Sequence, residues 1–215
     1  MKAKFATMIL GALLFAGGPV FASGVNFDFS TPAGALGVSQ TYTSNSVTIT
    51  AYGWSGCSGG VNVVLTGCTA HDLYGKNAGG DENGLGLTGS SDFEIGTNQM
   101  VQLDLTNLIN AGATSVTLAI GSVQSGEGYD IWEGNALGSS GSAVITDGTL
   151  DGTAFTVGLN SKDPYLGISA YSSDVLLTSL AAPTPTPEPG TLALLGTGLL
   201  AFGFGLRRRF ASHSV

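Results

Sequence analysis

Short alternations of apolar and polar residues, broken by glycine, constrain the fold of this 215-residue chain more than any other feature. In residues 101–105 and 116–120, every second residue is apolar, so these apolar side chains lie on one face of an extended chain. Such a period of two is typical of a half-buried β-strand. The 34 glycines stand mostly between these segments, where turns need positive φ angles. The chain is therefore expected to fold mainly from β-strands.

The predicted elements are short and closely spaced. The pattern predicts ten strands, at 25–29, 47–51, 61–66, 101–105, 116–120, 129–133, 143–146, 155–159, 165–170 and 175–180, and one helical turn at 107–113. About ten strands at a spacing of roughly ten residues favour an all-β fold, a jelly-roll-like β-sandwich over residues 23–182. A solenoid of repeats is the alternative, although no fixed period is visible.

The C-terminal segment has a different composition. Residues 183–190 are rich in proline, which favours a stiff, extended linker. The apolar stretch 191–206 would form a helix of roughly 24 Å, a marginal length for a transmembrane span of about 30 Å. The cationic residues Arg207, Arg208 and Arg209 follow, and they predict that the tail 207–215 stays cytoplasmic.

This order of motifs resembles a known sorting signal. Pro187, Glu188 and Pro189, an apolar helix and an arginine cluster together resemble the PEP-CTERM signal of bacterial surface proteins. The resemblance implies a Gram-negative-type bacterium and an exosortase, a membrane-embedded transpeptidase, as the partner that cleaves near the Pro-Glu-Pro motif. In this reading the motif is a substrate and carries no catalytic residue. A plain C-terminal membrane anchor is the alternative.

The N-terminus predicts export. Residues 1–22 combine two lysines, a short apolar stretch and small residues before a cleavage point, as secretory signal peptides do. We expect passage through the Sec translocon and cleavage by signal peptidase between Ala22 and Ser23. An uncleaved N-terminal anchor is the alternative. The predicted route is an intermediate anchored in the inner membrane, followed by release to the cell surface or the extracellular space.

Charge and cysteine content agree with export. Residues 23–182 hold two lysines and 14 acidic residues, a formal charge of −12, so phosphate groups would be repelled and a nucleic-acid partner is excluded. Cys57 and Cys68 are the only cysteines, and in an oxidising compartment they are expected to form a disulfide.

Candidate ligand sites are few. Asp81, Glu82 and Asn83 lie between glycines, and their hard oxygen ligands suit Ca²⁺, the one candidate cofactor. A solvated acidic turn is the alternative. Seven aromatic residues could stack on sugars or fill the core: Tyr52, Trp54, Tyr74, Tyr129, Trp132, Tyr165 and Tyr171.

No catalytic set emerges from these residues. His71 is the only histidine of the central domain, and no nucleophile–histidine motif accompanies it. We therefore expect no enzyme activity and a structural or adhesive role in the envelope or exopolysaccharide layer. A Ca²⁺-dependent carbohydrate-binding module and a polysaccharide hydrolase are the alternatives.

Overall fold

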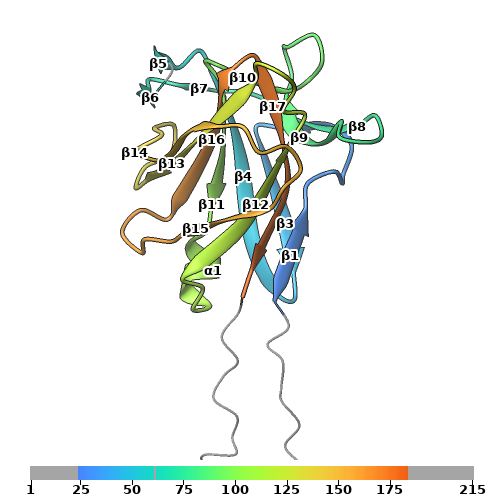
Figure 1. Cartoon of the computed structure of the whole chain (residues 1–215). Helices are drawn as coiled ribbons and strands as arrows, with labels where there is room; N and C mark the ends of the chain where they lie inside the picture. Colours follow the sequence, from blue (N-terminus) through green and yellow to red (C-terminus); the bar gives the residue numbers. More distant parts are fainter. Residues whose placement is uncertain (1–23, 61, 184–215) are drawn as a thin grey trace, which may run out of the picture. The chain divides into compact units, whose positions relative to one another are not determined.

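A computed structural model of the chain describes residues 24–60 and 62–183. The described part is all-β, and every strand pair is antiparallel (Figure 1). An eight-stranded sheet contains β1 (Val25–Asp28), β2 (Gly34–Gly37), β8 (Leu73–Asn77), β9 (Asn83–Leu87), β10 (Ile95–Gly96), β12 (Ser115–Gly121), β15 (Phe155–Gly158) and β17 (Asp174–Ala182).

A second large sheet has seven strands. It contains β3 (Ser39–Ser44), β4 (Val47–Ser55), β7 (Thr69–Ala70), β11 (Met100–Asp104), β13 (Gly128–Gly134), β14 (Ser142–Gly148) and β16 (Tyr165–Ser172). A separate hairpin is formed by β5 (Ser58–Gly60) and β6 (Val63–Thr66), and one short helix, α1 (Thr106–Asn110), follows β11.

One hydrophobic core draws on both large sheets. Leu103 and Ile168 come from the seven-stranded sheet, and Leu118 and Leu177 from the eight-stranded sheet; all four are fully buried. The period-two pattern predicted this outcome for residues 101–105 and 116–120. Burial of these apolar side chains is the main stabilising contribution to the fold.

The seven-stranded sheet is also covered on its outer face. The β5–β6 hairpin buries Leu65 against Met100 and Cys57, and Trp54 packs at the edge of this second cluster. The disulfide between Cys57 and Cys68 closes the hairpin, as the sequence predicted. The hairpin covers Met100, and the loop between β13 and β14 covers Gln102 through hydrogen bonds at Ala136, Gly138 and Ser139, so β11 is buried on both faces.

The two ends of the described chain meet. Val25 of β1 pairs with Ala182 of β17, so the N- and C-terminal strands leave the sheet side by side (Figure 1). β17 is also paired along its length with β12 and, toward its start, with β10. Asp174 therefore lies at the opposite end of β17, roughly 26 Å from Ala182 at 3.3 Å per residue.

Several strands were not predicted. β8 and β9 contain glycines, which in the sequence suggested turns. In the structure these glycines instead let neighbouring backbone segments approach the strands closely. A Cβ at Gly75 would lie 2.0 Å from the carbonyl oxygen of Pro32, and one at Gly84 would lie 2.7 Å from that of Leu177. The polar strand β3 has no apolar alternation and was missed for that reason.

Candidate functional site

The loop that joins β9 to β10 is fixed at both ends. At its start, the backbone N–H of Thr88 donates to the carbonyl of Asp72 at 2.9 Å, and Nε2 of His71 donates to the carbonyl of Thr88 at 2.7 Å. At its end, Oε1 of Glu94 accepts a hydrogen bond from Nζ of Lys76 in β8, and inside the loop the N–H of Glu94 donates to Oγ of Ser90 at 3.0 Å. His71 therefore positions this loop, and no catalytic partner is needed to explain it.

An aromatic pair holds the middle of the loop against the sheet. The ring of Phe93 stacks on Tyr74 of β8 with a centroid separation of 4.0 Å. A Cβ at Gly86 would come within 2.0 Å of the carbonyl oxygen of Phe93, so only glycine allows the loop to lie this close. The packing fixes the positions of Asp92 and Glu94, which flank Phe93 in the sequence.

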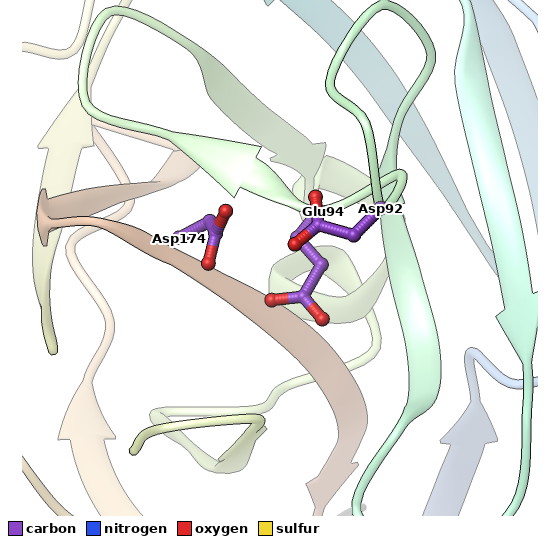
Figure 2. Close-up of side chains that lie close together, drawn as sticks. All are labelled: Asp92, Glu94 and Asp174. Carbon is purple, nitrogen blue, oxygen red and sulfur yellow. The ribbon is translucent and has the colours of Figure 1, made fainter. Parts of the chain in front are cut away.

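Strand pairing brings a third acidic residue to the same place. β10 pairs with the start of β17, with Gly96 opposite Asp174. One carboxylate oxygen from each of Asp92, Glu94 and Asp174 lies within 4.8 Å of the others. Figure 2 shows these three carboxylates gathered between the loop and β17. Such a group of hard oxygen ligands can bind a divalent cation.

Glu94 is the most enclosed member of the group, with 2% of its surface exposed. Its Oε1 accepts hydrogen bonds from Nζ of Lys76 at 2.5 Å and from Oγ of Ser122 at 2.9 Å. Lys76 also forms an ion pair with Glu82, and Ser122 contacts Oε1 of Glu82 at 3.1 Å. Glu82 is thus joined to Glu94 through two shared partners.

The protonation of the cluster follows from burial and these contacts. Burial raises the pKa of Glu94 to about 7, against the opposing effect of Lys76 and Ser122. The hydrogen bond from Lys76 lowers the pKa of Glu82. Burial, and next the negative charges of Asp92 and Glu127, raise the pKa of Asp174. The site therefore holds more negative charge than is favourable in a partly desolvated position.

Two carboxylate oxygens in the cluster lack hydrogen bonds. Within residues 24–60 and 62–183, neither Oε2 of Glu94 nor Oδ1 of Asp92 has a hydrogen-bond partner, although both atoms are buried. Leaving a buried acceptor unpaired costs about 1–3 kcal/mol, and more for a charged group. A bound cation or proton would satisfy these atoms.

Three residues around the cluster adopt unusual backbone conformations. Phe93, Ser122 and Ser173 have φ angles of 66°, 56° and 56°, although none is glycine. Such conformations cost of order 1–3 kcal/mol each and are concentrated at functional sites in proteins. They place Glu94, its hydroxyl partner and Asp174 together.

The predicted Ca²⁺ ligands Asp81, Glu82 and Asn83 have different surroundings from one another. Asp81 and Asn83 line a shallow pocket of about 240 Å³ together with Asp28. Asn83 begins β9, and its side chain accepts from the N–H of Gly79 and donates to the carbonyl of Gly80. Glu82 instead joins the Glu94 network. Ca²⁺ binding at these three residues stays a prediction.

Asp174, Ser122 and Lys76 were not predicted as members of a site. No sequence signal marked them, because their contacts arise from the pairing of distant strands. Of the seven aromatic residues considered for sugar stacking, Tyr129 and Trp132 are buried in the interior. The other five are half-buried: Tyr52, Trp54, Tyr74, Tyr165 and Tyr171.

The remaining predicted functional residues lie outside the described residues. These are the cleavage point at Ala22 and Ser23, the motif Pro187, Glu188 and Pro189, the apolar stretch 191–206, and Arg207, Arg208 and Arg209. In the part of the chain that is described, no helix combines the length and apolar character needed to cross a bilayer.

Comparison with known proteins identifies the C-terminal segment. Residues 185–209 match the family described as the PEP-CTERM protein-sorting motif. No curated protein and no solved structure matches the chain significantly. The chain is therefore a protein with a PEP-CTERM sorting motif, which marks it for exosortase processing and for a surface or extracellular location.

Proposed function

We propose that this protein is a non-enzymatic component of the cell envelope or exopolysaccharide layer, with a structural or adhesive role. It consists of a jelly-roll-like β-sandwich ectodomain, a proline-rich linker, and one short membrane helix that serves sorting. The observation that supports this proposal most strongly is the sorting motif, which begins three residues after the last residue of β17.

The position of the motif relative to β17 suits proteolytic release. β17 pairs with β1, β9, β10 and β12, so a cut within it would disrupt the eight-stranded sheet. A cut near Pro187–Pro189 lies beyond this strand and leaves its pairing intact. In the proposed route the Sec translocon exports the chain and signal peptidase cleaves before Ser23. The helix 191–206 then holds the chain in the membrane until exosortase acts.

A matched pair of variants tests this route. Substituting Pro187→Ala together with Glu188→Ala should leave a full-length species in the membrane fraction, since the protease loses its recognition motif. The control is Thr184→Ala, at the position just before the sorting motif, which matches residues 185–209. This variant should be processed like the wild type. Fractionation and immunoblotting measure both. Normal trimming of the Pro187/Glu188 variant would refute the route.

A second candidate function is Ca²⁺-dependent carbohydrate binding. It is favoured by the position of Phe93, which is 38% exposed, stacks on Tyr74 and sits between Asp92 and Glu94. An aromatic face beside bound Ca²⁺ could contact a sugar ring. A glycan array run with Ca²⁺ and with chelator decides this: binding to no glycan in either condition removes the candidate.

The absence of enzyme activity is a separate proposal with its own test. Incubation of the mature protein with purified exopolysaccharide should release no reducing ends. Their appearance in proportion to protein concentration would establish a hydrolase instead.

A further inference from the structure

The carboxylates of Asp92, Glu94 and Asp174, near the start of β17, carry more negative charge than the neighbouring Lys76 balances. Within the described residues, Lys76 is the cation that contacts Glu94, and it also pairs with Glu82. Counting the Lys76–Glu82 pair as neutral leaves a formal charge of −3 on Asp92, Glu94 and Asp174. Carboxylates gathered within 4.8 Å repel one another unless a proton or cation lies between them.

The enclosed carboxylate of Glu94 gives an independent indication of a ligand. Glu94 is 98% buried, and one of its two oxygens, Oε2, lacks a partner among the residues described. Oδ1 of Asp92 is a second buried oxygen without one. Buried carboxylate oxygens are normally paired with a donor or a metal ion, so a missing positive group is the simplest account.

We infer that Asp92, Glu94 and Asp174 form a Ca²⁺ site that fastens the β9–β10 loop to β17. Ca²⁺ binds oxygen ligands at 2.3–2.6 Å, so two oxygens on opposite sides of the ion are separated by about 4.8 Å. Mg²⁺ needs oxygens at 2.0–2.1 Å, or about 4.2 Å across, and a regular octahedron. Mg²⁺ also usually binds only one or two protein carboxylates and keeps several waters, whereas Ca²⁺ accepts several carboxylates in variable geometry, so a set of three carboxylates within 4.8 Å favours Ca²⁺.

Two of the three carboxylate residues are partly exposed to solvent. Asp92 and Asp174 are half-buried, so one side of the cluster is open to solvent, while Glu94 closes the other. Three carboxylates cannot complete the six to eight ligands that Ca²⁺ takes unless water or bidentate contacts supply the rest. Because the site is partly exposed, we expect it to bind Ca²⁺ as weakly as extracellular Ca²⁺ modules do, with a Kd on the order of 10⁻⁴–10⁻³ M.

The position of the site suggests its effect. β10 and the start of β17 lie at the end of the domain opposite to the paired ends of β1 and β17 (Figure 1). Bound Ca²⁺ would hold the loop and its Phe93 ring in one arrangement at this linker-distal end. The inference does not rest on the proposed function, because Ca²⁺ binding is measured on the purified protein alone.

Calorimetric titration of the chelator-treated mature protein with CaCl₂ tests the inference, with thermal unfolding recorded in Ca²⁺ and in Mg²⁺. We expect about one Ca²⁺ per chain and a melting temperature that rises with Ca²⁺ more than with Mg²⁺. Asp174→Asn, which removes one ligand charge at nearly constant volume, should weaken binding at least ~10-fold. Asp92→Asn should have the same effect, and it replaces the first variant if that one does not fold.

Asp81→Asn is the matched control, because Asp81 lies in the turn for which the sequence predicted Ca²⁺ binding. It should change the affinity less than about twofold. Absence of Ca²⁺ binding by the wild-type protein would overturn the inference. Unchanged binding by Asp174→Asn and Asp92→Asn would overturn it equally, and loss of binding in Asp81→Asn alone would move the site to the turn at 80–83.

Discussion

Removal of the disulfide by the double substitution Cys57→Ser and Cys68→Ser should destabilise the protein without detaching the hairpin that it closes. The β5–β6 hairpin has other attachments to the domain. The N–H of Leu65 donates to Oγ of Ser140 at 2.8 Å, and the N–H of Ser140 donates to the carbonyl of Leu65 at 3.0 Å. These bonds and the burial of Leu65 remain when the disulfide is lost.

The magnitude follows from the loop that the disulfide closes. Cys57 and Cys68 are separated by 11 positions. In the chain-entropy account, a loop of this length restricts the unfolded state by about 2.8 kcal/mol. For a domain of about 160 residues, the corresponding decrease in melting temperature is about 8 °C.

Urea unfolding of the mature wild-type protein and of the double variant, each with and without dithiothreitol, measures this effect. The wild type should lose about 2.8 kcal/mol of unfolding free energy on reduction. The double variant should match the reduced wild type and be unaffected by dithiothreitol, which makes it the control for the reagent. A loss below about 1 kcal/mol, or one above about 5 kcal/mol, would refute the assignment to loop closure.

Two further predictions concern the loop and its acidic residues. Gly86→Ala should lower the unfolding free energy by about 3 kcal/mol, because its Cβ would collide with the carbonyl of Phe93. Gly158→Ala, whose Cβ would meet no atom of the described residues within 4 Å, should change it by less than about 0.5 kcal/mol. Equal effects in urea unfolding would contradict this. In chelator, the unfolding free energy should fall as the pH rises from about 5 to 7.5. Burial raises the pKa of Glu94 from 4.5 in the unfolded chain to about 7 in the folded protein. The protonated Glu94 side chain therefore contributes its full stabilisation below pH 4.5, and this contribution is lost as the pH rises through 7. Glu94→Gln should flatten this dependence, and an unchanged slope would count against Glu94 as its source.

The strand content was largely predictable because period-two burial is a local property. In the alternating run 116–120, the apolar residues Val116, Leu118 and Ile120 are all fully buried in β12. The predicted strand at 129–133 corresponds to β13, and the helical turn at 107–113 overlaps α1. The pattern failed at β9, because its glycines serve close packing rather than turns: Gly86 accommodates the carbonyl of Phe93.

The acidic cluster was only half visible in the sequence. Asp92 and Glu94 follow the predicted acidic turn at 80–83 within about a dozen residues, but Asp174 is 80 positions away from Glu94. Their proximity depends on the pairing of β10 with β17, and that register is a property of the whole sheet. Lys76 and Ser122 were missed for the same reason, since their roles depend on which carboxylates surround them.

The intact mass of the protein recovered from the cell surface or medium, before and after reduction, tests the central claim of an exported and trimmed protein most directly. The account predicts a chain that begins at Ser23 and ends near Pro187–Pro189. On reduction it should gain the mass of two hydrogen atoms, as expected for the bond between Cys57 and Cys68. A mass that retains residues 1–22 or the arginines at 207–209, or one that reduction does not change, would contradict it.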